Sequence, residues 1–149
     1  MKKDKNELKA EWKKRPLKFR IEAVIHDGQW YTFDKWKRVA LVKDENGIYR
    51  IDYKDMEAKI RKHHIHISIF CSPHNPTGRV WNREELEKVM AIYQKYDVTV
   101  ISDEIWSDLV MPGVKHIPTQ SVSEDAKSRT IAFYAPSKTF NLAGLVASY

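Results

Sequence analysis

The sequence predicts an α/β fold built around a parallel sheet, and two observations support this. Three short apolar segments, 65–70, 98–101 and 129–134, have the length and β-branched content of buried strands. Segments with helically spaced apolar residues lie before the first of these strands and between the first and the second. Alternation of helices and apolar strands over residues 52–134 is typical of parallel strands joined by crossovers.

The first 42 residues follow a different pattern. Residues 1–20 are polar and Lys-rich, which indicates a short helix or an arm without regular structure. Residues 19–33 alternate apolar and polar residues on both sides of Asp27-Gly28, a pattern that predicts a β-hairpin. We therefore divide the chain into a basic leader with a hairpin-like segment, residues 1–42, and an α/β part, residues 43–149.

The elements of the α/β part have recognisable boundaries. Asn46-Gly47 separates two short apolar runs and predicts a second turn. Asp52 is suited to cap a helix that ends in basic residues. Asn82 followed by Glu85 resembles a capping box before a helix with apolar residues on one face. Residues 121–128 are polar, and we expect them to connect the second and third strands.

The net charge of +6 is confined to the start of the chain. Of the 26 basic and 20 acidic residues, residues 1–20 hold nine and three, which leaves 17 of each sign in the remainder. A nucleic-acid surface needs a basic face on the folded part, so we expect no nucleic-acid partner. The alternative is a binding module that uses the basic arm, residues 1–20, to contact nucleic acid or an acidic protein.

Cysteine content and hydropathy point to the cytoplasm. The single cysteine, Cys71, excludes an internal disulfide framework and a zinc site with several cysteines. There is no run of about 18 apolar residues to span a membrane. The basic N-terminus lacks the apolar stretch and cleavage site of a secretory signal. We therefore expect a cytoplasmic protein without a membrane partner.

Polar residues follow each of the three predicted strands. Asn75 lies in the loop after the first strand, Asp103 ends the second, and Ser137-Lys138 follows the third. The separations of 28 residues from Asn75 to Asp103 and 35 from Asp103 to Lys138 each match about one crossover unit. Because ligands bind beyond the carboxyl ends of parallel strands, we expect these side chains to form one site.

Three strings that contain these residues resemble a known family. The strings SPHNPTGRVW, ISDEIWSDLV and APSKTFNLAGL resemble the large domain of fold-type I pyridoxal-phosphate enzymes, the class I/II aminotransferases. Among these, they are most similar to the subgroup of cystathionine and cysteine-S-conjugate β-lyases. The resemblance covers residues 43–149 and implies part of the mostly parallel-sheet large domain of such an enzyme, truncated at both ends.

The resemblance implies a role for each residue of the predicted site. Pyridoxal 5'-phosphate would be the cofactor, with Lys138 joined to its aldehyde as a Schiff base and acting as the catalytic base. Asp103 would keep the pyridine nitrogen protonated, and the Asn75 amide would donate to the phenolic oxygen. Ser137 would donate to the phosphate. Trp106 stands where aminotransferases often have a tyrosine, and its indole can stack or donate but cannot accept.

Each of these residues also has a simpler interpretation when it is considered alone. Asn75-Pro76 is compatible with a plain turn, Asp103 with a helix cap or loop residue, and Ser137-Lys138 with an inert surface pair. Their order and spacing favour the cofactor site over these three separate explanations.

The histidines and the cysteine leave alternatives open. His63, His64 and His66 suggest a metal, but no cysteine or carboxylate stands at a matching spacing, so we expect a solvated face. His74 is equally compatible with an approach to the substrate and with an ordinary loop position. Cys71 is expected in the core.

The resemblance implies a carbon–sulfur β-lyase that converts cystathionine or cysteine conjugates to pyruvate, ammonia and a thiol. The alternatives are a class I/II aminotransferase and an inactive fragment. The family also implies a small-molecule amino-acid substrate and a homodimer for the intact enzyme. The sequence departs from the family at Val146, where many aminotransferases have a phosphate-binding arginine, and in its length. These departures suggest a truncated or rearranged product, or one half of an interrupted enzyme.

Overall fold

The structure is a computed structural model that describes residues 23–26, 29–32, 37–142, 144 and 147–149. Its contacts divide the chain into two units, Met1–Arg38 and Val39–Tyr149. The predicted boundary between residues 42 and 43 rests on the sequence resemblance and stays a prediction. Residues 1–20, on which the basic-arm alternative depends, lie outside the described part of the chain.

The first unit contains an antiparallel hairpin. Strand β1 (Ala23–His26) pairs with β2 (Gln29–Thr32), and the last pair joins His26 to Gln29. This pairing confirms the hairpin predicted from the alternating residues. The Asp27-Gly28 pair that suggested the turn lies outside the described residues.

The second unit begins with another antiparallel hairpin, formed by β3 (Leu41–Lys43) and β4 (Tyr49–Ile51). Oδ1 of Asp44 accepts a hydrogen bond of 2.9 Å from the backbone N–H of Asn46. Gly47 has a φ of 75°, which a residue without a Cβ adopts at little cost. The turn predicted from Asn-Gly is therefore confirmed.

Side-chain caps begin both long helices at the predicted residues. Asp52 caps α2 (Tyr53–His63) by accepting a hydrogen bond of 2.9 Å from the N–H three residues later. A reciprocal capping box of Asn82 and Glu85 begins α3 (Arg83–Lys95). Both caps satisfy backbone donors that the first helical turn leaves without a partner.

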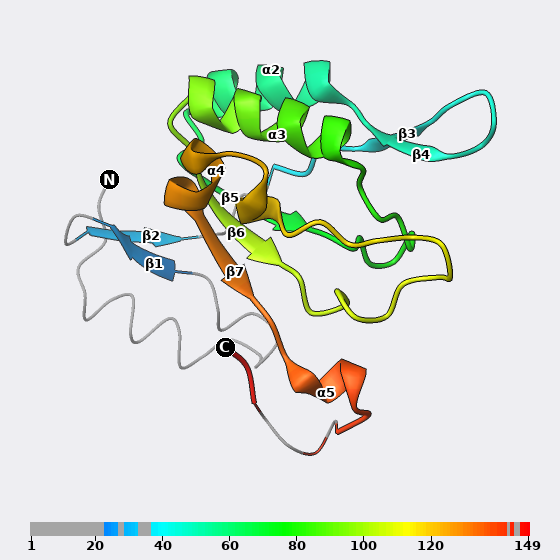
Figure 1. Ribbon diagram of the computed structural model, residues 1–149. Coiled ribbons are helices and arrows are strands. Elements are labelled where there is room, and N and C mark those ends of the chain that lie inside the picture. Colours follow the sequence, from blue (N-terminus) through cyan, green and yellow to red (C-terminus); the bar gives the residue numbers. More distant parts are fainter. Residues whose placement is uncertain (1–22, 27–28, 33–36, 143, 145–146) are drawn as a thin grey trace. The chain divides into compact units, whose positions relative to one another are not determined.

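A three-stranded parallel sheet is the centre of the second unit (Figure 1). Its order is β5 (Ile67–Cys71), β6 (Thr99–Asp103) and β7 (Thr130–Phe133). Helix α3 connects β5 to β6, and a longer connection with the short helix α4 (Glu124–Arg129) leads from β6 to β7. The parallel pairing confirms the predicted fold class.

Three short elements were not predicted: α4, the 3-10 turn Thr119–Ser121 and α5 (Pro136–Thr139). Helix α4 begins where Ser123 Oγ accepts a hydrogen bond of 3.0 Å from the N–H of Ala126. Ala126 is its buried residue, and one small apolar residue in six produces no visible helical period.

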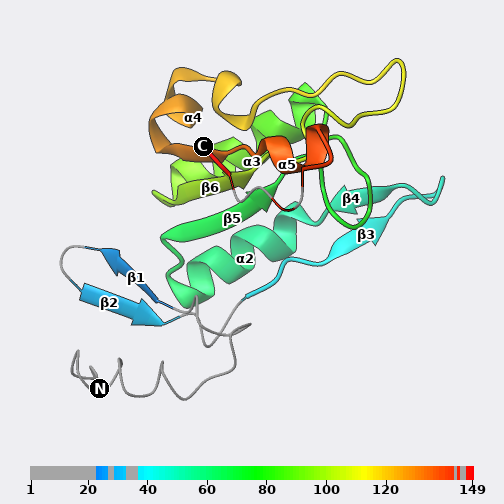
Figure 2. The ribbon, with the colours of Figure 1, turned by 90° about the horizontal axis from the view of Figure 1, so that it is seen from below.

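The two faces of the sheet differ in burial. Figure 1 shows α2 and α3 side by side, and Figure 2 shows β5 beside β6 from below. Phe70, Val100 and Ser102 point to the buried face, whereas Ile69 and Ile131 on the other face are 50% and 55% exposed. Parallel sheets are usually buried on both faces, whereas this sheet is buried on one face only in the described part of the chain.

The core lies between the helices and the buried face of the sheet. Its buried apolar residues are Ile51, Met56, Ile60, Phe70, Trp81, Leu86, Val89, Met90, Tyr93, Val98, Val100 and Ala126. Trp81 is 1% exposed, and its indole N–H donates a hydrogen bond of 2.9 Å to the Cys71 carbonyl. Cys71 itself is only half-buried, so its predicted core position is wrong. Within the described ranges, no helix is long and apolar enough to cross a bilayer.

Candidate active site

The ends of the three parallel strands bring the predicted site residues to one edge of the sheet. Cys71 pairs with Asp103, and Asp103 pairs with Phe133 on the far side. The loop with Asn75 leaves β5 at this edge, and the turn with Lys138 follows β7. The carboxyl edge of the sheet thus carries an amide, a carboxylate and an amine.

The loop that carries Asn75 is closed by its own backbone. The N–H of His74 donates to the carbonyl of Arg79 at 2.8 Å, and the N–H of Gly78 donates to the carbonyl of His74 at 2.8 Å. The ring of His74 also bonds Thr77 Oγ1 at 2.8 Å. Asn75 lies at the exposed end of this closed loop, so its side-chain amide is accessible to a ligand.

His74 occupies a partly protected position between the loop and the core. Its ring lies edge-on to Trp81, with 6.0 Å between the ring centroids. Burial lowers the pKa of His74 below its ordinary value of 6.5. The neutral ring is therefore favoured at pH 7, and the hydrogen bond to Thr77 satisfies one of its nitrogens.

Asp103 ends β6 with a partly exposed side chain. Its carbonyl accepts a hydrogen bond of 3.0 Å from the N–H of Ser72, which joins the ends of β5 and β6. Its carboxylate accepts from the N–H of Ile105 at 3.3 Å. One carboxylate oxygen thus has a backbone donor, and the side chain remains accessible from solvent.

Lys138 and Trp106 lie together although they come from different strand ends. Lys138 is exposed on α5, and its Nζ is 5.9 Å from the centroid of the Trp106 ring. Thr139 Oγ1 donates a hydrogen bond of 2.8 Å to Asp108, which connects α5 to the turn after β6. Ser137 is half-buried in the same helix. A cation within about 6 Å of an indole face is attracted by it.

A pocket of about 450 Å³ separates the Asn75 loop from the segment after β6. Asn75 and Trp106 are among its lining residues, but Asp103, Ser137 and Lys138 are not. The remaining lining residues are Pro73, His74, Pro76, Gly78, Arg79, Val80, Leu109, Val110, Met111 and Val114. The structure thus divides the predicted site between this pocket and the adjoining ends of β6 and β7.

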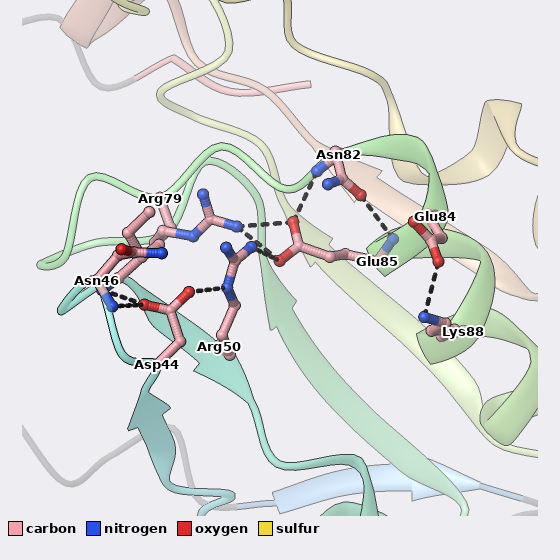
Figure 3. A network of polar contacts seen from close by, with 9 residues as sticks. Asp44, Asn46, Arg50, Arg79, Asn82, Glu84, Glu85 and Lys88 are labelled. Carbon is pink, nitrogen blue, oxygen red and sulfur yellow. Dashed lines mark hydrogen bonds and ion pairs between the residues drawn. The ribbon is translucent and has the colours of Figure 1, made fainter.

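One network anchors the Asn75 loop to α3 (Figure 3). Nη2 of Arg79 donates to both oxygens of Glu85 at 2.6 and 2.7 Å. Arg50 donates to the same carboxylate at 3.0 Å and to Asp44 at 2.9 Å. Glu85 also accepts from the backbone N–H of Asn82 at 3.0 Å. The helix cap and the base of the loop therefore share one carboxylate.

A second buried carboxylate, Glu104, lies directly after Asp103 and is completely shielded from solvent. It accepts hydrogen bonds from Ser102, His116, Thr119 and Tyr134. Burial raises the pKa of Glu104, but these hydrogen bonds together hold it below its ordinary value of 4.5.

The sequence interpretation assigned no role to Arg79 or Glu104, and it gave Glu85 a role only in the capping box of α3. Glu104 stands in the string that resembles the family, next to Asp103, and this adjacency was its only sequence signal. The partners of Glu104 lie up to 30 residues away along the chain. Their proximity could not be read from local spacing.

The three clustered histidines lie at the surface, where α2 ends and β5 begins. His63, His64 and His66 are exposed, as expected for a solvated face. Over the ranges that the structure describes, no group of three His, Cys, Asp or Glu residues is arranged to hold a metal ion.

The chain is an α/β protein with an amide, a carboxylate and an amine at the carboxyl edge of its parallel sheet, the edge at which α/β proteins commonly bind small molecules. The family model described as aminotransferase class I and II matches residues 22–148. The chain belongs to this family, whose enzymes depend on pyridoxal phosphate and act on amino acids as small-molecule substrates.

Two curated relatives are particularly similar. Cystathionine beta-lyase PatB of Bacillus subtilis (strain 168) is 47% identical over 105 residues, which are 70% of this chain and 27% of that protein. Protein MalY of Escherichia coli (strain K12) is 38% identical over 111 residues, 74% of this chain and 27% of that protein. The chain thus spans about a quarter of the length of these relatives.

Solved structures have the same fold. Cystalysin from Treponema denticola, which contains a pyridoxal 5'-phosphate cofactor, aligns with a TM-score of 0.71 and 43% identity. The alignment covers 76% of this chain and 28% of cystalysin. A pyridoxal-phosphate-bound putative aminotransferase from Clostridium difficile 630 aligns with a TM-score of 0.69 and 49% identity over 72% of this chain and 27% of that protein. The predicted fold family is confirmed.

Proposed function

We propose that the chain is the part of a pyridoxal-phosphate-dependent carbon–sulfur β-lyase that holds the reactive lysine of the enzyme. The substrates would be cystathionine or cysteine conjugates, and the products a thiol, pyruvate and ammonia, with water consumed. The observation that carries the proposal is that Asn75, Asp103 and Lys138 each follow or end one of three adjoining parallel strands at the same edge of the sheet. The similarity to PatB favours a lyase.

The donor set at this edge fits pyridoxal phosphate. The cofactor has an aldehyde that needs a primary amine, and Lys138 has the exposed amine. Its pyridine nitrogen needs an anion to keep its proton, and the Asp103 carboxylate can provide this charge. Its phenolic oxygen needs a neutral donor such as the Asn75 amide, and its phosphate needs donors such as the Ser137 hydroxyl.

When bound, pyridoxal phosphate would supply an electron-withdrawing ring that stabilises negative charge on the α-carbon of the substrate. Lys138 Nζ, once the substrate amine has displaced it from the cofactor, would take the proton from that carbon, and the thiolate would leave the β-carbon with the electron pair of the broken carbon–sulfur bond. Asp103 would keep the ring nitrogen protonated, and the Asn75 amide would donate a hydrogen bond that orients the ring. Trp106 lies beside Lys138 and limits the positions of its amine by an attractive contact with the ring.

Reductive labelling of the full chain tests this proposal directly. Pyridoxal phosphate is added, an absorbance band in the visible is recorded, and borohydride reduction is followed by peptide mapping. We expect the label on Lys138, because only this lysine would lie beside the other cofactor contacts. Lys138→Arg is the matched control and should lose the label. A label spread over exposed lysines such as Lys62 would contradict the proposed site.

A second test addresses the role of Asp103. In an intact homologue, the change equivalent to Asp103→Asn should leave covalent attachment of the cofactor largely unchanged, because the aldehyde lies across the ring. It should slow removal of the α-proton by about 10²–10³-fold, the usual cost of losing one electrostatic stabiliser. Nearly normal turnover would show that Asp103 does not face the ring nitrogen.

Product analysis separates the lyase from the aminotransferase alternative. With a cysteine conjugate as substrate, a lyase releases pyruvate and a thiol in equal amounts. An aminotransferase instead requires a keto acid as amino acceptor and leaves the carbon–sulfur bond intact. An intact homologue that transfers the amino group without releasing thiol would replace the lyase proposal by the alternative.

A further inference from the structure

The Glu104 carboxylate joins side chains from segments that lie far apart in the sequence. One oxygen accepts from Ser102 Oγ and from the N–H of Thr119, both at 2.9 Å. The other accepts from His116 Nε2 and from the Tyr134 hydroxyl, both at 2.8 Å. The side chain is fully buried, so water does not replace these donors. Both carboxylate oxygens are therefore fully used within the protein.

The bond to Tyr134 ties the end of β6 to the exit of β7. The backbone N–H of Glu104 also donates to the carbonyl of Phe133 at 3.0 Å, so two bonds join these strand ends. The backbone of Tyr134 pairs with Tyr149 at 2.7 and 2.9 Å, and their rings are stacked. Tyr134 precedes Lys138 by four residues. A shift of Tyr134 would therefore displace the helix that presents the lysine.

The bonds to His116 and Thr119 close a loop that starts at Glu104 itself. The intervening residues include Trp106, which contacts Lys138, and the apolar residues 109–111 that line the pocket. Both ends of this loop are thus fixed by the same side chain.

A carboxylate is an unusual choice if stability alone were required. Its four donors include no lysine or arginine among the described residues, and burial of such a charge is costly. A well-packed apolar side chain would stabilise the site as well or better. A carboxylate does provide two oxygens that accept several bonds in one fixed geometry, which an apolar side chain cannot.

We propose that Glu104 is a positioning residue that holds Lys138 and Trp106 in their mutual arrangement by joining the end of β6, the exit of β7 and the base of the intervening loop. This inference rests on the proposed function, because the arrangement serves to present Lys138 to the cofactor.

Nuclear magnetic resonance of the full chain without cofactor tests the inference independently of activity. In the unaltered chain we expect cross-relaxation between the Lys138 side chain and the Trp106 ring. Glu104→Ala should abolish it and shift the Trp106 indole signal. The matched control is Tyr93→Phe, which removes another buried hydrogen bond, of 2.8 Å to Ser68 Oγ. The control should leave both signals unchanged.

Two further variants keep the test decisive if Glu104→Ala unfolds. Tyr134→Phe removes one of the four bonds and should weaken the cross-relaxation, whereas Glu104→Gln keeps the size and one oxygen and should restore part of it. Unchanged Lys138 and Trp106 signals in Tyr134→Phe and in any folded Glu104 variant would overturn the inference. An equal change in Tyr93→Phe would also overturn it, because the effect would then be general loosening.

Borohydride labelling distinguishes a failure of this inference from a failure of the proposed function. If the unaltered chain is labelled at Lys138 and the Glu104→Ala chain loses its preference for Lys138, both ideas are supported. If the unaltered chain is not labelled at Lys138, the proposed function fails, while the resonance comparison still decides the role of Glu104.

Discussion

Glu85 and Glu104 are two buried carboxylates behind different parts of the candidate site, and their charges are balanced differently. Glu85 is 8% exposed and binds two guanidinium groups, those of Arg79 and Arg50 (Figure 3). Glu104 is fully buried and binds two hydroxyls, one backbone N–H and one histidine. The first network is based on ion pairs and the second on hydrogen bonds.

The difference in partners follows from the difference in surroundings. The Arg50 side chain is 38% exposed and that of Arg79 is 21% exposed, so both side chains keep some contact with water. The Glu104 side chain, in contrast, is fully buried, so its carboxylate has no contact with water. Four hydrogen bonds replace the missing water there.

The two networks also hold different parts of the edge of the sheet. Glu85 fixes Arg79, whose backbone closes the loop that carries Asn75. Glu104 fixes the two strand ends that carry Asp103 and Lys138. The comparison teaches that the loop with Asn75 and the strand ends next to Asp103 and Lys138 are each held by a buried carboxylate.

The largest expected effect is that of Glu104→Ala on stability. Removal of the carboxylate leaves several buried donors without an acceptor, each at a cost of about 1–3 kcal/mol. We expect a loss of about 3–5 kcal/mol, because more than one of these donors is left unpaired. Urea denaturation followed by circular dichroism measures it. If Glu104→Ala loses less unfolding free energy than Glu85→Ala, the ion-paired network contributes more to stability than the hydrogen-bonded one, contrary to this prediction.

Glu85→Ala should cost less, about 1–3 kcal/mol, because the freed guanidinium groups can turn to water. The variant loses the capping box and the anchor of the Asn75 loop at the same time. The same urea titration measures this cost. An effect as large as that of Glu104→Ala would mean that the ion pairs are as strongly shielded as the hydrogen-bonded network.

Asn82→Ala isolates the cap from the ion pairs. It removes the 2.8 Å hydrogen bond from the N–H of Glu85 to Asn82 Oδ1 but leaves both arginine contacts of Glu85 in place. We expect a loss of about 1 kcal/mol, the usual value for a helix cap. Asn82→Ser is the control and should retain most of the stability. If Asn82→Ala loses as much unfolding free energy as Glu85→Ala, the ion pairs of Glu85 with Arg50 and Arg79 contribute nothing to stability.

The smallest expected effect is the contribution of the Glu104 charge to the pH dependence of stability. Burial raises the pKa of Glu104, but the bonds from His116, Thr119, Tyr134 and Ser102 hold the net value below 4.5. A lowered pKa in the folded state stabilises the protein above about pH 4.5, and this contribution is lost as the pH falls through the folded value.

The measurement compares the urea midpoint of the unaltered chain and of Glu104→Gln between pH 7 and pH 3. Other carboxylates titrate in both proteins, so only the difference reports on Glu104. This difference should be largest at pH 7 and should shrink as the pH falls. A constant difference would show that the charge of Glu104 has no part in its network.

Local patterns predicted the elements whose signals are short in range. Asp52 and the pair Asn82 and Glu85 marked the helix starts because a cap needs only the next three residues. Asn46-Gly47 marked a turn for the same reason. Helix α4 was missed because it presents one buried alanine to the core.

The sequence by itself determined the order of the two long helices and the parallel strands, the parallel sheet and the presence of Asn75, Asp103 and Lys138 at or after strand ends, because β-strand period and crossover length are local properties. The tertiary structure alone decided which side chains support these residues. Glu104 meets Tyr134 across 30 residues, and Glu85 meets Arg50 across 35. Contacts at such separations depend on how the strands and loops pack in three dimensions, and no local pattern in the chain encodes them.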